Sequence, residues 1–184
     1  MIKKIVITGG LGYIGTELCK IYSGVSWHHK IIVIDNRFIS ERVNQIQNWN
    51  MEFVHGDILD KDLVKKYFKN ADIVHHLAGI TDVPRTKSES SNDKDEKINL
   101  VGETGTQNIL DAIDDRCKII FPSTHVVYEG IDKVKTNIKE DEQTKPVLSY
   151  SSSKAINEKQ LKNSGKNYVI LRLGSVYGYS TDSM

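Results

Sequence analysis

The hydrophobic pattern of the chain alternates between short apolar runs and longer amphipathic stretches. Segments of five or six residues that contain short apolar runs, rich in Ile and Val, are typical of strands buried on both faces. Such runs predict strands at Lys3–Thr8, Lys30–Asp35, Met51–His55, Asp72–Leu77, Cys117–Pro122 and Tyr168–Leu173. Stretches with helical periodicity predict helices at Gly12–Ser23, Asp60–Phe68, Asp95–Ile113 and Tyr150–Lys162.

Strands that alternate with helices predict an α/β fold, a Rossmann-type doubly wound parallel sheet with helices on both faces. We expect this domain to span residues 1–173, and residues 174–184 to leave the sheet as a loop. Two polar segments, Gly79–Lys94 and Glu129–Ser149, follow strand ends, where open α/β sheets bind their ligands. Most of their residues are nevertheless expected to be ordinary surface loop.

A glycine-rich turn follows the first predicted strand and opens the first predicted helix. Gly10, Gly12 and Gly15 fit G-x-G-x-x-G, while Gly9, Gly12 and Gly15 fit G-x-x-G-x-x-G. Glycine permits a tight turn and lets the backbone approach a pyrophosphate closely. The free amides and the dipole of the helix N-terminus then favour the anion, so the turn predicts a dinucleotide-binding site.

An acidic residue ends the second predicted strand, and another follows the third. Asp35 lies 20 residues after Gly15, where a carboxylate takes the adenosine ribose hydroxyls. Its charge would repel a 2′-phosphate, which favours NAD over NADP, although Arg37 weakens this preference because an arginine accommodates that phosphate. Asp57 either bonds the adenine amino group or is an acid at the N-terminus of the following helix.

Candidate catalytic residues gather around the fifth predicted strand. Tyr150 and Lys154 form a Y-x-x-x-K motif that opens the last predicted helix, and positions i and i+4 share one helical face. About one such motif is expected by chance in this chain, so its position is what carries weight. Ser123 and Thr124 follow the fifth strand at the carboxyl edge of the sheet, and Asn99 completes a candidate proton-relay set.

These motifs together resemble the extended short-chain dehydrogenase/reductases, the NAD-dependent nucleotide-sugar epimerase/dehydratase family, with spacing similar to its UDP-galactose 4-epimerase-like members. The resemblance covers essentially the whole chain. It rests on Thr8–Gly15, Asp35, Gly56–Ile58, Leu77–Gly79, Asn99–Gly102, Ser123–Thr124, Val127–Tyr128, Tyr150 with Lys154, and Arg172–Gly178.

The resemblance implies NAD as cofactor and a nucleotide-sugar as substrate. The implied cofactor-binding residues are Gly9, Gly12, Tyr13, Ile14, Gly15, Asp35, Asn36, Asp57, Ile58, Leu77, Ala78, Gly79, Asn99, Tyr150 and Lys154. The implied catalytic residues are Thr124, Tyr150 and Lys154, and the implied substrate-binding residues are Ser123, Thr124 and Ser175.

The implied reaction is epimerisation by transient hydride transfer. Tyr150 would act as general base on a sugar hydroxyl while hydride passes to the nicotinamide, and the keto intermediate would rotate and take the hydride back on its other face. A phenol has a pKa of about 10, so work at neutral pH needs a drop of about 3 units, which the Lys154 ammonium and the nicotinium charge favour. Thr124 would bond the substrate oxygen, because the family pattern places that hydroxyl four residues before Tyr128.

Other functions stay open on the sequence. One is a reductase or dehydrogenase acting on a nucleotide-sugar or another hydroxylated small molecule, and another is a non-catalytic NAD(P)H-binding module that senses redox state. Dehydration is disfavoured, because the family's dehydratases place Asp-Glu after the catalytic Thr and this chain has His125 and Val126. We expect His125 to have a structural role rather than to contact substrate. Ser175 occupies a position at which many family members have Asn.

The composition of the chain argues against some classes of binding partner. The 25 basic and 24 acidic residues leave no excess charge that would indicate nucleic acid or a membrane surface. No apolar stretch approaches the length of a membrane span, so we expect a cytoplasmic protein, with Cys19 and Cys117 as reduced buried thiols. Family members continue well beyond Met184 and commonly dimerise through two helices present here. We therefore expect a fragment that lacks the C-terminal substrate lobe, and a homodimer.

Overall fold

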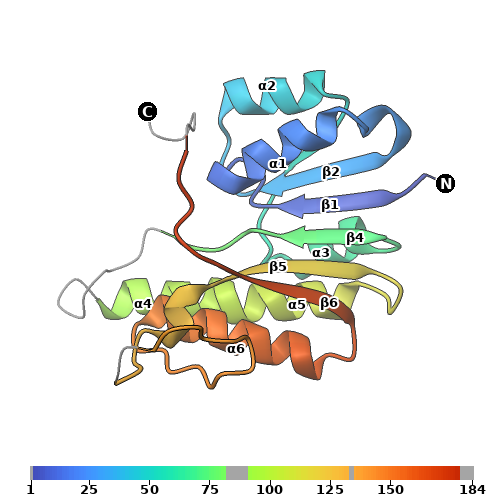
Figure 1. The fold of residues 1–184 in the computed structure, drawn as a ribbon. Coiled ribbons are helices and arrows are strands. Elements are labelled where there is room, and N and C mark those ends of the chain that lie inside the picture. Colours follow the sequence, from blue (N-terminus) through green and yellow to red (C-terminus); the bar gives the residue numbers. More distant parts are fainter. Residues whose placement is uncertain (1, 82–90, 133–134, 179–184) are drawn as a thin grey trace.

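A computed structural model describes residues 2–81, 91–132 and 135–178. Its centre is a six-stranded sheet in the order β3-β2-β1-β4-β5-β6 (Figure 1), in which every neighbouring pair is parallel. The strands are β1 (Lys4–Thr8), β2 (Lys30–Asp35), β3 (Glu52–His55), β4 (Ile73–His76), β5 (Lys118–Thr124) and β6 (Asn167–Leu173). This order reverses direction between β1 and β4, so the predicted doubly wound fold is confirmed. Folds of this class bind their ligands at such a switch point.

Helices cover both faces of the sheet (Figure 1). One face carries α1 (Tyr13–Ser23) and α2 (Ser40–Asn48), and the other carries α3 (Lys61–Phe68), α5 (Gly105–Ala112) and α6 (Ser149–Asn163), with α4 (Asn92–Asn99) leading into α5. Short turns of helix occur at η1 (Ser26–His28), η3 (Leu100–Thr104) and η4 (His125–Tyr128).

Alternation along each strand divides the core in two. In β1, Ile5 and Ile7 pack with Cys19 of α1, whereas Val6 between them packs with Phe68 of α3 and Ile109 of α5. Successive side chains of a strand point to opposite faces, so a continuously apolar strand is what a sheet covered on both faces requires.

The helix α2 was not predicted from the sequence. Its nine residues include only two aliphatic side chains, Val43 and Ile46, on an otherwise polar segment. Both are buried against the sheet, and so is Arg42. Packing on β2 and β3 rather than a strong local hydrophobic period therefore stabilises this helix.

The single helix expected over Asp95–Ile113 is divided by a π-helical turn, η3. Such a turn releases backbone carbonyls from regular helical bonding. Side chains of α6 take up two of them: Asn157 donates to the Gly102 carbonyl and Gln160 to the Glu103 carbonyl, each at 3.0 Å. The turn therefore fixes the α4–α5 unit on α6, the helix that carries Tyr150.

Other boundaries shift by a few residues. β5 continues through Thr124, so Ser123 and Thr124 end the strand instead of following it. The loop expected over Gly79–Lys94 ends earlier, because α4 begins at Asn92, and its residues 82–90 lie outside the described part. Within the ranges described above, no helix is both long and apolar enough to cross a membrane.

Candidate active site

The turn between β1 and α1 presents an uncapped helix N-terminus. Gly12 is the N-cap of α1, makes no side-chain cap, and is followed by no acidic residue in the first turn. The amides of Tyr13 and Ile14 have no acceptor within the helix, because the first turn of any α-helix leaves its N–H groups unpaired. This donor set fits a pyrophosphate, as the glycine pattern predicts.

Two glycines make this turn sterically possible. Gly9 has a φ of +66°, and a Cβ there would stand 2.8 Å from the Ala78 amide nitrogen. A Cβ at Gly15 would stand 2.2 Å from the Gly9 carbonyl oxygen. The turn therefore lies directly on the end of β4, where the Ala78 amide also donates to Thr8 Oγ1 at 3.0 Å. Two of the predicted cofactor segments, Gly9–Gly15 and Leu77–Gly79, are brought together in this way.

Two charged side chains hold the peptide groups of Leu11 at the tip of this turn. The Asp35 carboxylate accepts from the Leu11 amide at 2.9 Å, and the buried Arg42 guanidinium donates to the Leu11 carbonyl. The other Asp35 oxygen accepts from the backbone amide of Arg37 at 3.0 Å and from its Nε at 3.3 Å. Sequence reasoning found Asp35 and Arg37 but missed Arg42, which lies on the unpredicted helix α2.

The predicted adenine-side residues also come together. Asn36 Nδ2 donates to Asp57 Oδ2 at 2.9 Å, and Asp57 Oδ1 accepts from the Leu59 amide at 2.9 Å. The N-cap of α3 is instead Asp60, which accepts from the amides of Asp62 and Leu63. Ile58 has a buried side chain, and its carbonyl accepts from Asn108 at 3.0 Å. Asp57 therefore orders the turn before α3 beside Asn36, without capping the helix itself.

Tyr150 and Lys154 lie on one face of α6, as the spacing predicts. Lys154 Nζ donates to the Pro122 carbonyl at 3.0 Å and lies 4.5 Å from the Phe121 ring centre and 5.9 Å from the Tyr150 ring centre. Burial lowers the pKa of Lys154 to about 8 and raises the pKa of the Tyr150 hydroxyl above its usual value. The ammonium is thus held against the end of β5, next to the tyrosine.

The two hydroxyls that end β5 have different surroundings. Thr124 is 8% exposed, and its Oγ1 accepts from the Val126 amide at 3.3 Å. Ser123 is 4% exposed, and its hydroxyl donates to Glu158 Oε1 at 2.6 Å. The interior hydrogen bond of Ser123 gives no support to the predicted substrate contact at that residue, and Thr124 is the better candidate.

A buried ion pair between Glu158 and Arg172, which sequence reasoning missed, contacts the Ser123 hydroxyl through Glu158. Glu158 accepts from Arg172 Nε at 2.9 Å and Nη2 at 2.6 Å, and Arg172 also donates to the Tyr128 hydroxyl and to the Glu140 carbonyl. Burial opposes ionisation of Glu158, but the hydrogen bonds from Arg172 and Ser123 outweigh it and lower its pKa. The pair joins α6, β5, β6 and the 129–149 loop. Arg172 had been noted only as part of a motif.

Glu129 anchors the start of α6. Its Oε1 accepts from the amides of Val147 and Leu148, each at 2.8 Å, and from the Ser151 hydroxyl. Burial opposes ionisation, but these three hydrogen bonds outweigh it and lower the pKa of Glu129. An anion at this end of the helix also suits the helix dipole, so Glu129 fixes the backbone before Tyr150 and the Ser151 side chain after it.

The histidines of β4, His75 and His76, are structural. His76 is 2% exposed, with Nδ1 3.1 Å from Thr8 Oγ1 and Nε2 3.0 Å from Thr106 Oγ1. Burial, assisted by the Lys154 charge, lowers the pKa of His76 to about 3. His75 Nε2 lies 2.8 Å from the Tyr22 hydroxyl. His125, at the start of η4, lies 3.2 Å from the Leu173 carbonyl through its Nδ1.

The segment after β6 crosses the carboxyl edge of the sheet towards α1 (Figure 1). The Tyr13 hydroxyl donates to the Gly178 carbonyl at 3.0 Å. Ser175 lies on this segment with its side chain exposed. Asn99 is half-buried at the end of α4, which packs against α6. Both predicted residues therefore lie near this edge, and their ligand contacts stay predictions.

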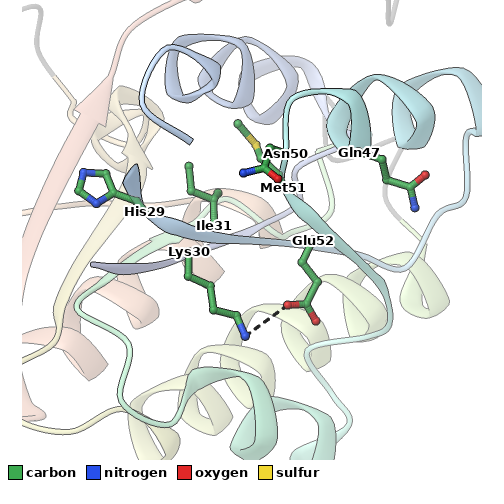
Figure 2. A pocket seen from close by; sticks show the side chains of 7 residues that line it. All are labelled: His29, Lys30, Ile31, Gln47, Asn50, Met51 and Glu52. Carbon is green, nitrogen blue, oxygen red and sulfur yellow. Dashed lines mark ion pairs between the residues drawn. The ribbon is translucent and has the colours of Figure 1, made fainter. Parts of the chain in front are cut away.

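A shallow pocket at the opposite edge of the sheet has no part in this site. It is lined by His29, Lys30, Ile31, Gln47, Asn50, Met51 and Glu52, with Lys30 and Glu52 paired at 3.5 Å (Figure 2). These residues surround the starts of β2 and β3, whereas the glycine turn follows the end of β1. The chemistry-bearing residues therefore lie at the other ends of the strands.

Comparisons with known proteins place this chain among known relatives. A model of the NAD dependent epimerase/dehydratase family matches residues 5–184. A putative UDP-glucose 4-epimerase from Methanocaldococcus jannaschii is 32% identical over 97% of this chain, and a dTDP-D-glucose 4,6-dehydratase from Dictyostelium discoideum is 30% identical over 96%. The matches cover 57% and 44% of those proteins, so this chain spans about half the length of the relatives.

Among solved structures, UDP-glucose 4-epimerase from Brucella ovis in complex with NAD superimposes with a TM-score of 0.77 at 29% identity. The match covers 98% of this chain and 54% of that one. With the family model matched over nearly the whole sequence, the chain belongs to the NAD-dependent epimerase/dehydratase family.

Proposed function

We propose that this chain is the cofactor-binding and catalytic part of an NAD-dependent nucleotide-sugar epimerase. The observation that carries the proposal is the position of Lys154, whose ammonium lies between Tyr150 and the end of β5. Thr124 ends that strand, and the uncapped N-terminus of α1 lies at the same edge of the sheet. An anion site and a tyrosine–lysine pair at one edge suit hydride chemistry on a hydroxylated substrate.

Several residues would hold the dinucleotide. The first-turn amides of α1 would bind the pyrophosphate, Asn36 and Asp57 would border the adenine, and Asp35 would take a ribose hydroxyl. Lys154 would bind the nicotinamide ribose. Bound NAD would supply a hydride acceptor.

The chain's own residues would move the proton. Tyr150 would remove it from a sugar hydroxyl while Thr124 donates a hydrogen bond to the substrate oxygen. Burial raises the pKa of Tyr150, which is the wrong direction for a base, so a nearby positive charge has to reverse it. Lys154 has a pKa of about 8 and therefore still carries that charge at neutral pH.

Epimerisation is favoured over dehydration by the residues after Thr124. An acid and a base would be needed there to eliminate water, whereas His125 and Val126 occupy the positions, and His125 Nδ1 lies 3.2 Å from the Leu173 carbonyl. The dehydratase among the relatives shows that the family holds both activities, so this residue pair is the discriminating feature.

The test begins with native mass spectrometry of the chain with NAD, which should show one dinucleotide per chain. NAD-loaded protein that includes residues 1–184 is then incubated with UDP-glucose, and the sugar product is analysed with and without Tyr150→Phe. Formation of the C4 epimer with NAD retained supports the proposal. Net NADH release indicates a dehydrogenase, and NAD binding with no turnover that depends on Tyr150 indicates a non-catalytic module.

We also infer a homodimer through α4, α5 and α6. Leu100, which follows α4 in η3, is 53% exposed, and Ile156 of α6 is 39% exposed; a shallow hollow between α5 and α6 includes Leu110 and Ile156. Apolar side chains at such a surface favour association. Light scattering of the chain and of Ile156→Glu tests this, because the variant should be monomeric while a wild-type monomer would refute the inference.

A further inference from the structure

Arg37 lies two residues after the end of β2, and only one nitrogen of its guanidinium forms a hydrogen bond with Asp35. Its backbone amide and Nε both donate to Asp35 Oδ1, at 3.0 and 3.3 Å. The side chain of Arg37 is nevertheless 49% exposed, whereas that of Asp35 is 4% exposed. The ion pair therefore has a buried carboxylate inside and a guanidinium that reaches outward.

The outer nitrogens of this guanidinium lie beside the anion site of α1. Among residues 2–81, 91–132 and 135–178, Nη1 and Nη2 of Arg37 have no hydrogen-bond partner. Nη2 stands 3.5 Å from the point that a Cβ of Gly12 would occupy, and Gly12 is the N-cap of α1. A second set of anion donors thus adjoins the first-turn amides.

The same geometry changes what Asp35 can do. Its Oδ1 already accepts two hydrogen bonds from Arg37, and its Oδ2 accepts one from Leu11. One lone pair on Oδ2 therefore remains for a ribose hydroxyl. The negative charge that would exclude a 2′-phosphate is paired with a guanidinium, whose planar fork suits phosphate oxygens.

We propose that Arg37 sets the cofactor selectivity of this chain, by binding the 2′-phosphate of NADP with its outer nitrogens. The chain then accepts NADP as well as NAD, despite the carboxylate at the end of β2. This inference rests on the proposed function, because it requires a dinucleotide at the glycine turn.

Calorimetric titration of the chain with NAD and with NADP tests the inference. Wild-type protein should bind NADP within about tenfold of NAD. Arg37→Ala should lose about tenfold or more of its NADP affinity, because hydrogen bonds to a charged group are removed, while NAD affinity changes by less than about threefold. Adenosine 2′,5′-bisphosphate against 5′-AMP repeats the comparison with probes that differ only in the 2′-phosphate.

Arg116 offers a matched control. Its amide donates to Asp114 Oδ1 at 3.0 Å and its Nη2 lies 3.8 Å from the same carboxylate, so it repeats the relation of Arg37 to Asp35. It lies in the turn before β5, at the amino edge of the sheet. Arg116→Ala should leave both affinities unchanged.

The outcomes separate this inference from the proposed function. NAD binding with an NADP affinity that Arg37→Ala does not alter overturns the inference and leaves the proposed cofactor in place. Binding of neither dinucleotide overturns both. Arg37→Lys, which keeps the charge but loses the fork, should fall between the wild type and Arg37→Ala, and an NADP affinity equal to that of Arg37→Ala would contradict a charge-based contact.

Discussion

The Asp35 carboxylate accepts a hydrogen bond from the Leu11 amide at 2.9 Å and so ties the end of β2 to the glycine turn. Arg42 donates to the carbonyl of the same leucine from α2. The backbone N–H and C=O of Leu11, at the tip of the turn, are therefore both fixed by buried charged side chains. A turn held in this way is preorganised, and binding a ligand costs less conformational entropy.

Asp35 should therefore stabilise the protein before any ligand binds. We expect Asp35→Ala to lower the free energy of unfolding by about 2 kcal/mol, because a buried amide and a guanidinium lose their acceptor. Urea denaturation without nucleotide measures this. Asp114→Ala, which removes a more exposed carboxylate from a similar turn, should change stability by less than about 0.5 kcal/mol. If Asp35→Ala were as stable as the wild type, Asp35 would have no structural role and could act only by contacting the ligand.

Gly15 should tolerate no side chain. A Cβ there would stand 2.2 Å from the Gly9 carbonyl oxygen, and backbone cannot move aside as a flexible side chain can. Gly15→Ala should cost about 1–3 kcal/mol of stability and abolish dinucleotide binding. Gly174→Ala is the control, since nothing lies within 4 Å of its Cβ position. Thermal unfolding and titration with NAD read out the two effects, and normal NAD binding by Gly15→Ala would contradict the steric argument.

The Glu158–Arg172 pair should be needed for folding. Glu158→Gln leaves the Arg172 charge without its anion, and loss of one partner of a buried ion pair costs on the order of 3 kcal/mol. Lys162 also approaches Glu158, at 3.5 Å, but its side chain is 50% exposed. Lys162→Ala should therefore cost less than about 0.5 kcal/mol. Chemical denaturation of both variants distinguishes the two contacts, and similar losses would refute the distinction.

Substitutions at Tyr150 and Lys154 should affect different properties, turnover for Tyr150 and thermal stability for Lys154. Tyr150→Phe should reduce turnover by about 100-fold or more, since the general base is lost, with NAD affinity within about twofold of wild type. Lys154→Met should unfold at a higher temperature than wild type, because burial disfavours the ammonium and lowers its pKa to about 8. Scanning calorimetry tests this, and a less stable Lys154→Met would show that the contacts to Pro122 and Phe121 outweigh desolvation.

His76 should make the protein sensitive to acid. Its pKa is lowered from 6.5 to about 3, so the unfolded chain takes up a proton first as the pH falls below about 6.5. The free energy of unfolding should then fall by up to about 1.4 kcal/mol per pH unit between pH 6.5 and 3. His76→Gln should flatten this slope, and His28→Gln, at an exposed histidine, should not. Parallel slopes for all three proteins in urea titrations would remove His76 as the cause.

Much of the site could be predicted because its signals are local. The glycine spacing depends on one turn, and Tyr150 and Lys154 need only the helical repeat to share a face. Arg42, Glu129 and Glu158 could not be identified in this way. Each acts on a group distant along the chain, such as Leu11 for Arg42 or Ser123 for Glu158, and no periodicity records such a pairing.

The sequence by itself determined the six strands, the parallel α/β class and the residues at the carboxyl edge. These features depend on the burial of strand residues and on turn chemistry, and both are set by residues that are adjacent in the sequence. Only the tertiary structure decided that α2 forms, that η3 interrupts the α4–α5 helix, and that Ser123 turns to Glu158 while Arg37 reaches outward. The physical reason is that these features depend on desolvation and hydrogen bonding between distant segments. Those energies arise only once the sheet has brought the segments together.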